Sequence, residues 1–331
     1  MSKLSRPSIN KFQEGHHVVT FDDGEEEGTD FMCDEEPHML SYPFAPGYLP
    51  MRFGDILSSQ KCEYEVVRKL GWGGSSSVWL ARRRDDRTSY FAVKILTCSA
   101  SARIRYKEGY ELETHKRIRQ DSASSHPGRT YCADITDVFL ATNHHGVHLC
   151  FVFRAHSGSV ARLVNEMSGG VGTFRLPIPA IASILRQTIL GTSYLHSLGM
   201  VHTDIKASNL FITIDKEAQA IDQFLRENPS RTYPPRYEPA LSSEPIVTAV
   251  TEPLPPLDFT TFEEMGICLG DFGEAVPAEK TAGVSEAMPT ILRAPEIVLG
   301  HNWGKPVDVW AVGCLETLRN QCQKPFPTLE I

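Results

Sequence analysis

The chain has 331 residues, of which 41% are hydrophobic and 22% are charged. This length fits about two domains or lobes, and the composition excludes wholesale disorder, a collagen-like repeat and a disulfide-stabilised miniprotein. The formal net charge is −8, but nine acidic residues lie between Asp22 and Glu36 with no lysine or arginine among them. The rest of the chain is close to neutral, which argues against direct nucleic-acid binding.

The sequence carries no sign of secretion or membrane insertion. It has no run of about 18 apolar residues and no apolar signal core near its N-terminus. Its eight cysteines stand singly, without the spacing of a zinc site or a disulfide framework. We therefore expect an intracellular protein, cytoplasmic or nuclear or both, with no membrane association.

Residues 1–41 form the first predicted segment. They are polar and acidic, with too few large apolar positions to offset the entropy of ordering, so we expect an acidic disordered tail. Residues 42–63 mix aromatic residues with proline and glycine. This mixture predicts an extended lead-in packed against a domain.

Short apolar runs bounded by turn residues follow, and they predict an antiparallel meander with two later strands. The five predicted strands are 64–70, 77–83, 89–96, 135–142 and 147–153.

Two stretches predict helices. The charged stretch Arg103–Gln120 has scattered apolar positions and no proline, and Ile178–Leu198 has apolar residues near a 3.6-residue period and ends at Gly199.

Residues 226–256 hold eight of the chain's 22 prolines and no glycine. Such a stretch cannot form a helix or a central strand, so it predicts an inserted loop.

A glycine-rich turn lies directly between the first two predicted strands. Its residues are Gly71, Trp72, Gly73, Gly74 and Ser76, and Val78 follows in the next strand. Glycine at positions 71 and 73 lets backbone amides approach phosphate oxygens. A strand follows the glycines and the ending GK[ST] is absent, which excludes a Rossmann or a P-loop site. Alone, the turn is equally consistent with a hairpin that binds no ligand.

Lys94 follows Ala92 and Val93 in the third predicted strand, where a buried lysine requires anionic partners. The predicted helix that follows offers Glu111, whose carboxylate we expect to face the lysine. For Glu108 and Glu113 a solvated helix face is the better interpretation.

The strongest motif is His202-Thr-Asp204-Ile-Lys206-Ala-Ser-Asn209, between an apolar helix and a predicted strand. An aspartate that accepts a hydroxyl proton, a lysine two residues on and a metal-binding asparagine form a complete phosphoryl-transfer set. Downstream, Asp271-Phe-Gly supplies a second acidic metal ligand. Ala294-Pro-Glu296 follows. Asp308 then begins a segment that we expect to form a helix and to attach the catalytic loop to the C-terminal part of the domain.

In this order, the motifs resemble a eukaryotic protein kinase: a glycine-rich loop, a strand lysine, a catalytic loop, Asp-Phe-Gly and Ala-Pro-Glu. Within kinases, the sequence is similar to the SR-protein kinase (SRPK) family of the CMGC group. That similarity rests on Arg68-Lys-Leu-Gly-Trp-Gly73, on His126-Pro-Gly-Arg129 and above all on His202-Thr-Asp-Ile-Lys206. Thr203 stands where most kinases have arginine.

The resemblance implies an α+β, two-lobed kinase fold. It assigns the N-lobe and hinge to 64–156 and the C-lobe to 157–331, with a Pro-rich, spacer-like insert at 219–262. The chain ends soon after Gly313, where a kinase continues through further helices. We therefore expect an incomplete C-lobe.

The resemblance also implies ATP and Mg²⁺ as cofactors and assigns a role to each matching residue. Asp204 is the expected base, Lys206 stabilises the transferred group, Lys94 holds the α- and β-phosphates and pairs with Glu111, and Asn209 and Asp271 hold the metal. The residues expected around ATP are Gly71, Trp72, Gly73, Gly74, Ser76, Val78, Ala92, Lys94 and the hinge residues Phe153, Arg154, Ala155 and His156.

The family further implies a monomer that phosphorylates serine in Arg-Ser-rich splicing factors. Three interpretations stay open at this point. An active serine/threonine kinase accounts for the intact catalytic groups, whereas an ATP-binding pseudokinase or scaffold, or an incomplete kinase fragment, accounts better for the short C-lobe.

Overall fold

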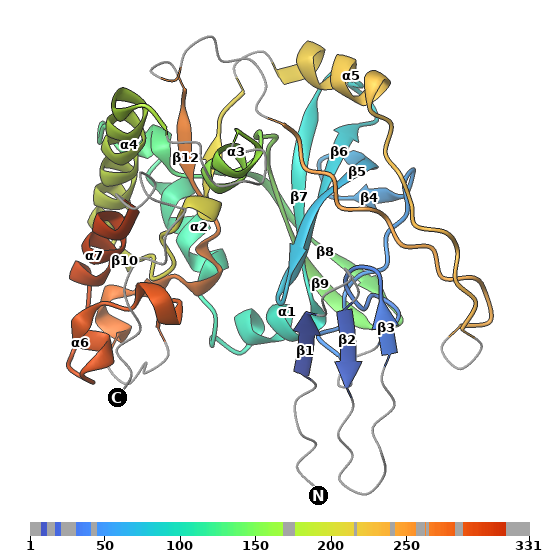
Figure 1. Ribbon diagram of the computed structural model, residues 1–331, viewed down its shortest axis with the longest axis horizontal. Coiled ribbons are helices and arrows are strands. Elements are labelled where there is room, and N and C mark those ends of the chain that lie inside the picture. The colour runs from blue at the N-terminus through green and yellow to red at the C-terminus, as the bar shows by residue number, and fades with distance from the viewer. Residues whose placement is uncertain are drawn as a thin grey trace, which may run out of the picture. The chain divides into compact units, whose positions relative to one another are not determined.

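The computed structural model describes residues 8–11, 17–20, 31–40, 45–167, 176–214, 217–238, 242–255, 262, 265–281 and 287–315. The chain divides into two compact units, whose elements are labelled in Figure 1. Unit 1 comprises Met1–Arg105, Ile135–Ala155 and Glu217–Pro253, and unit 2 comprises Tyr106–Asp134, His156–Lys216 and Leu254–Ile331.

Unit 1 is built on a six-stranded antiparallel sheet with strand order β4-β5-β6-β7-β9-β8. Its strands are β4 (Ile56–Ser58), β5 (Glu63–Gly73), β6 (Ser76–Arg83), β7 (Tyr90–Leu96), β8 (Ile135–Asn143) and β9 (Gly146–Arg154). The unit also contains a small sheet of β1 (Ser8–Lys11), β2 (His17–Thr20) and β3 (Phe31–Cys33), and the helices α1 (Cys98–Arg105) and α5 (Glu217–Glu227). The five strands predicted from the apolar runs are confirmed as β5 to β9.

One face of the sheet forms the core of unit 1. Because side chains alternate along a strand, every second residue of β6 and β7 lies on this face, as Trp79, Val93 and Ile95 do. Each of the three is at most 1% exposed. Burial of side chains of this size stabilises the fold by about 1.5–3 kcal/mol each, so the alternation determines which face packs inward.

Unit 2 is mainly helical, and α4 (Ile178–Ser197) is its longest helix. The other helices are α2 (Glu111–Gln120), α3 (Val160–Met167), α6 (Pro295–Val298) and α7 (Pro306–Cys314), with 3₁₀ turns η1 (Arg129–Tyr131), η2 (Ala207–Asn209), η3 (Phe272–Glu274), η4 (Ala278–Lys280) and η5 (Thr290–Leu292). Two short antiparallel pairs join β10 (Met200–Val201) to β13 (Val276–Pro277) and β11 (Leu210–Ile212) to β12 (Ile267–Leu269).

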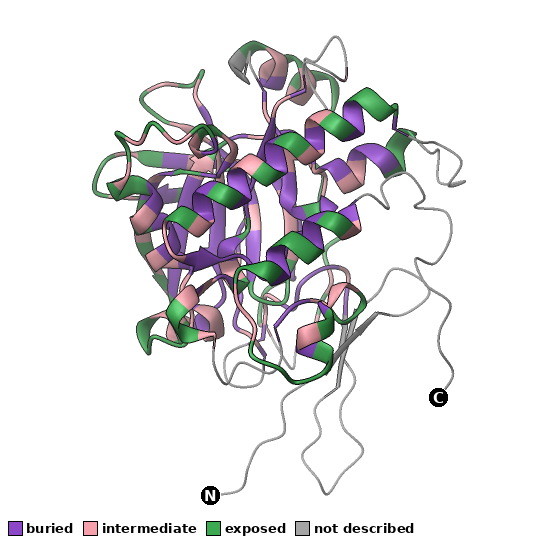
Figure 2. Cartoon of the chain, turned by 90° about the vertical axis from the view of Figure 1, so that its left-hand side faces the viewer, coloured by how far each residue is buried: buried purple, intermediate pink, exposed green. Residues whose placement is uncertain are grey.

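The helical period explains α4. Ile181, Ile184, Thr188 and Leu195 are buried at helical spacing, and Gly199 ends the helix with a φ of 73°. Figure 2 shows the resulting stripes of buried and exposed residues along the helices. The long helix predicted over Ile178–Leu198 is confirmed.

The helix predicted over Arg103–Gln120 is wrong as one element. The structure has α1, which ends at Arg105 in unit 1, and α2, which begins at Glu111 in unit 2. Between them Lys107 adopts a left-handed conformation with a φ of 61°, which no helix tolerates. The break therefore coincides with the boundary between the units.

The N-terminal segment also differs from the prediction of a disordered tail over 1–41. Strands β1, β2 and β3 pair with one another, and within 33–40 the side chains of Cys33, Glu35, Glu36 and Leu40 are buried. The other residues of 1–41 lie outside the described parts of the chain. Within the lead-in predicted over 42–63, Tyr48, Leu49 and Met51 are buried.

The Pro-rich insert, predicted over 219–262 within the C-lobe, belongs to unit 1 as far as Pro253. It begins with α5, and Thr251 then forms a parallel bridge to Lys69 of β5. Residues 239–241 and 256–261 of the insert are not described.

Among the described residues, no helix is long and apolar enough to span a bilayer.

Candidate active site

In unit 1 the sheet register gathers most of the predicted nucleotide-binding residues on the face opposite the core. Val78 of β6 pairs with Gly71 of β5 and with Lys94 of β7, and Ala92 pairs with Phe153 of β9. Paired residues share a face, and residues two apart on one strand share it too. Gly71, Val78, Ala92, Lys94 and Phe153 therefore form one continuous patch across four strands.

The Gly-rich loop, residues Gly71–Ser76, joins β5 to β6. A Cβ built at Gly71, Gly73 or Gly74 would meet no protein atom within 4 Å, and none of the three has a positive φ. The fold itself therefore has no need of glycine there. What the glycines leave open is the surface above the loop backbone, which is what a phosphate chain requires.

Trp72, predicted to bind the cofactor, lies differently from its neighbours. It pairs with Ser77, which places its side chain on the core side of the sheet, and its indole nitrogen donates a 2.6 Å hydrogen bond to Glu35. Its indole is therefore directed away from the face that carries Lys94, and only its backbone belongs to the open surface of the Gly-rich loop.

Lys94 is 8% exposed in the middle of β7. Its expected partner Glu111 is 3% exposed and begins α2 in unit 2. The ion pair between these two residues stays a prediction. The expected hinge falls at the junction of the units in the sequence: Phe153, Arg154 and Ala155 close the middle segment of unit 1, and His156 opens the next segment of unit 2.

The other predicted site residues lie in unit 2, beginning with those at the ends of the paired strands β11 and β12. Leu210 pairs with Leu269, so the residues at the ends of the two strands meet, and the Gly270 amide donates a 3.0 Å hydrogen bond to the Asn209 carbonyl. This register places Asn209 beside Asp271, although they are far apart in the sequence.

The Asp204 carboxylate is the centre of the catalytic loop. Its Oδ2 accepts hydrogen bonds from Lys206 Nζ at 2.8 Å and from Asn209 Nδ2 at 2.9 Å. Its Oδ1 is buried and has no hydrogen-bond partner among the described residues. A buried carboxylate oxygen without a partner is uncommon, and here it is available to accept a proton from a substrate hydroxyl.

Two further bonds fix the orientation of this loop. The Asp204 amide donates to His202 Nδ1 at 3.2 Å, so the ring proton is on Nε2, which donates to the Gly270 carbonyl at 3.1 Å. Phe272 follows in η3, and its ring lies edge-on to the rings of His202 and His115, at centroid distances of 5.4 and 5.2 Å.

Asp308 of α7 anchors the catalytic loop through hydrogen bonds to its backbone, as the sequence predicts for this helix. It is fully buried, and it accepts hydrogen bonds from the backbone amides of His202 and Thr203 and from His196 Nε2. Thr203 has a φ of 64°, a rare conformation for a β-branched residue. Its hydroxyl donates a 2.7 Å bond to the Glu274 carbonyl.

Asn209 and Asp271 fit a hard divalent cation. The Asn209 side-chain amide nitrogen donates to the carbonyl and carboxylate of Asp204, which leaves its oxygen to act as a ligand. Asp271 is exposed, with a left-handed φ of 59° that aspartate tolerates better than most residues. Amide and carboxylate oxygens are the ligands that Mg²⁺ prefers.

Sequence reasoning missed the contacts of the acidic N-terminal segment with the Gly-rich loop and the Glu274 carbonyl that binds Thr203. The first had no local signal, because Glu35 and Glu36 stand within a long acidic run. The second is a backbone group, which no motif reveals.

Residues 64–225 match the family described as the protein kinase domain. The chain is 26% identical over 288 residues to "Serine/threonine-protein kinase SRPK" of Physarum polycephalum, with 81% of this chain and 62% of the relative covered. It is 33% identical over 171 residues to mouse "SRSF protein kinase 3" (51% of this chain, 28% of the relative). It is 30% identical over 173 residues to "Protein kinase dsk1" of Schizosaccharomyces pombe (52% and 30%).

The chain has a protein kinase domain and is SRPK-like. The matched range 64–225 includes the Gly-rich loop, Lys94 and the catalytic loop, and it ends within α5, before Asp271. The chain spans less than two thirds of the length of each of these relatives. Protein kinase domains in general use ATP and a divalent metal, and the α+β fold of a β-rich and a helical part is the one expected.

Proposed function

We propose that the chain transfers the γ-phosphoryl group of ATP to a serine hydroxyl of a protein substrate. The Asp204 carboxylate carries this proposal: one oxygen is held by Lys206 and Asn209, and the other is buried and free of hydrogen bonds from the described residues. A pseudokinase or scaffold has no need of this arrangement.

In the proposed reaction the serine oxygen forms a bond to the γ-phosphorus and the bond from that phosphorus to the β,γ-bridging oxygen breaks. The hydroxyl proton passes to Asp204 Oδ1, and ADP leaves with the bridging oxygen. Lys206, whose Nζ lies 2.8 Å from Asp204 Oδ2, neutralises charge on the transferred group. Mg²⁺ held by Asn209 and Asp271 would shield the phosphate charges.

In unit 1, the open surface over Gly71 and Gly73 would take the phosphate chain, and Lys94 would bind the α- and β-phosphates. The adenine would bind the backbone atoms of Phe153–Ala155. The exposed side chain of Arg154 is not needed for this binding. The shared face of Val78, Ala92 and Phe153 supports this placement, since all three are apolar.

We further propose that the substrates are Arg-Ser-rich proteins and that the chain acts in the cytoplasm, the nucleus or both. The name of the mouse relative, SRSF protein kinase 3, supports this substrate class. Catalysis would not require phosphorylation of the activation segment, the stretch from Asp271 to Glu296. In most kinases an arginine stands at position 203 and a phosphate can neutralise its charge, whereas Thr203 carries no charge. Within unit 2 the segment after Asp271 is already tied to α2: Arg117 lies 3.6 Å from Glu279, and Lys280 lies over the Tyr110 ring.

The test is ATP-dependent phosphorylation of an Arg-Ser-repeat peptide by the purified full chain, with Asp204→Ala and Lys94→Met as controls. Melting curves with and without Mg-ATP accompany the assay. Transfer that both variants abolish, with their melting temperatures retained, supports the proposal. An ATP-induced melting shift without transfer would instead identify a nucleotide-binding pseudokinase, and the absence of a cooperative melt would indicate an incomplete domain.

A further inference from the structure

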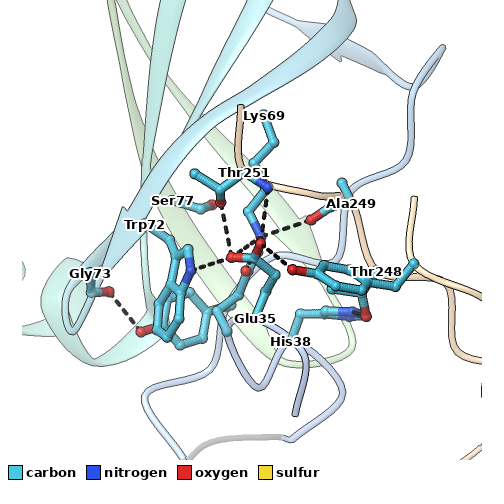
Figure 3. A network of polar contacts seen from close by, with 12 residues as sticks. Glu35, His38, Lys69, Trp72, Gly73, Ser77, Thr248, Ala249 and Thr251 are labelled. Carbon is cyan, nitrogen blue, oxygen red and sulfur yellow. Dashed lines mark hydrogen bonds and ion pairs between the residues drawn. The ribbon is translucent and has the colours of Figure 1, made fainter. Parts of the chain in front are cut away.

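Residues 33–40, hereafter the acidic segment, lie against β5 beside the base of the Gly-rich loop. Glu35 and Glu36 are 7% and 2% exposed, although they end the acid-rich stretch 22–36. Figure 3 shows Glu35 with Lys69 and Trp72 of β5 and with residues of the Pro-rich insert. All of these residues belong to unit 1.

The first attachment is an ion pair. Lys69 is completely buried, and its ammonium group binds Glu36, with Glu35 at 3.7 Å and the Ala249 carbonyl at 3.4 Å. Burial raises the pKa of Glu36, and the charge of Lys69 opposes that rise. If the acidic segment left, Lys69 would lose both carboxylates, and an unpaired buried charge is strongly unfavourable. The acidic segment is therefore held firmly to β5.

The second attachment reaches the Gly-rich loop itself. Glu35 Oε2 accepts hydrogen bonds from the Trp72 indole at 2.6 Å and from the Thr251 hydroxyl at 2.9 Å, and Oε1 accepts from the Thr251 amide at 2.9 Å. Tyr48 donates a 2.7 Å bond to the Gly73 carbonyl, and its ring lies edge-on to Trp72 at 6.1 Å. Trp72 is thus fixed on both sides.

These contacts matter because the Gly-rich loop has few side chains that could hold it, beyond the β5–β6 pairing and the hydrogen bond from the Thr97 amide to the Ser75 carbonyl. Its three glycines contribute no side chains, and nothing lies within 4 Å of where their Cβ atoms would be. Glycine also loses more conformational entropy on ordering than any other residue. The side chains of Trp72, in the loop, and of Lys69, just before it, lie on the face opposite Lys94 and leave the open surface unobstructed.

We propose that Glu35 and Glu36 are positioning residues that hold the Gly-rich loop in the conformation that binds the nucleotide triphosphate. This inference rests on the proposed function, in which that loop encloses the phosphates of ATP. The acidic segment is then a structural part of the nucleotide site, and the Pro-rich insert contributes through Thr251 and Ala249.

The test measures the Kd of Mg-ATP for the full chain by titration calorimetry, well below the melting temperature. Trp72→Phe removes the indole N–H and keeps an aromatic ring, Glu35→Ala removes the acceptor, and Glu35→Gln keeps one oxygen acceptor. Asp34→Asn is the matched control, because Asp34 is the preceding residue and its carboxylate lies 3.6 Å from Arg236 of the Pro-rich insert. Hydrogen exchange of the amides of residues 71–75 reports the order of the loop.

We expect Trp72→Phe and Glu35→Ala to raise the Kd about tenfold, which corresponds to about 1.4 kcal/mol, and to speed amide exchange in the loop. Glu35→Gln raises it less, and Asp34→Asn leaves it unchanged. If Glu35→Ala does not fold, Trp72→Phe decides, since Trp72 is only half-buried and the variant keeps an aromatic ring while it removes the N–H donor. A lower melting temperature with unchanged Kd and exchange would show a merely structural contact and overturn the inference. A wild-type chain that binds no Mg-ATP overturns the proposed function as well.

Discussion

The Asp308 carboxylate accepts a 2.7 Å hydrogen bond from the backbone amide of His202. Its other oxygen accepts from the amide of Thr203 at 2.8 Å. A helix and a loop that are more than a hundred residues apart in the sequence are therefore joined at one buried carboxylate. The strained φ of Thr203 persists because two of its groups are hydrogen-bonded: its amide donates to Asp308 and its hydroxyl donates to the Glu274 carbonyl.

Replacement of Asp308 by asparagine should destabilise unit 2 and lower activity together. The side-chain amide of asparagine would place an N–H donor against the backbone N–H of His202 or Thr203, so one of these two hydrogen bonds would be lost. A hydrogen bond to a charged group contributes about 1.5–3 kcal/mol to the free energy of unfolding. Urea denaturation and the peptide phosphorylation assay measure the two effects. Asp204→Asn is the contrasting variant: it should reduce transfer by about 10²–10⁴-fold and leave the free energy of unfolding nearly unchanged. Equal stabilities for wild type and Asp308→Asn would contradict the anchoring role.

Gly71→Ala should separate binding from folding. The added methyl group meets no protein atom, and the φ of Gly71 is not positive, so we expect the free energy of unfolding to change by less than about 1 kcal/mol. The affinity for Mg-ATP should fall severalfold, because the methyl occupies the surface reserved for phosphate. Gly128→Ala is the opposite case, since its Cβ would overlap the Leu190 carbonyl and destabilise the fold. Unaltered nucleotide affinity in Gly71→Ala would show that the open surface is not used.

His38 should make the stability of unit 1 depend on pH. Burial, with smaller contributions from Lys69, His145 and Arg52, lowers the pKa of His38 from 6.5 to about 4. The unfolded chain therefore binds a proton more readily between these values, and stability is lost as pH falls through them, by an amount on the order of 2 kcal/mol. Denaturation of wild type and His38→Gln at pH 7 and pH 4.5 measures the difference. Parallel losses in both proteins would exclude His38 as the cause.

Treatment with a phosphatase should leave the activity of the purified chain unchanged. Thr203 presents a hydroxyl to the Glu274 carbonyl where an arginine would need an anionic partner. The measurement is peptide phosphorylation before and after treatment, with mass spectrometry to confirm that no phosphate remains. Activity that disappears on treatment and returns on rephosphorylation would contradict the expectation.

The parts of the fold that could be predicted are those determined by neighbours in the sequence. Alternating residues revealed the strands that carry Val78 and Lys94, and the spacing within His202–Asn209 revealed the catalytic loop, because each pattern is complete within a few residues. The anchoring of that loop by Asp308 also followed from a motif.

The errors came from contacts between distant segments. Glu35 is buried against Thr251, which lies more than two hundred residues later in the sequence and donates two hydrogen bonds to it. Local composition shows an acidic stretch and nothing of that partner. In the same way, the break between α1 and α2 follows from the division into two units, which the run of helix-forming residues around Lys107 does not reveal.

The parallel bridge between Thr251 and Lys69 has a consequence for the behaviour of shortened versions of the chain. Among the described residues, strand β4 pairs with β5 only at Glu63–Glu65. The insert pairs with the edge of β5 near Lys69, where the Glu252 amide donates to the Lys69 carbonyl. An uncovered strand edge is a template for pairing with another molecule. A version of the chain that lacks the insert would therefore expose an unpaired edge of β5 next to the nucleotide site. We expect it to aggregate during purification before any defect in catalysis could be measured.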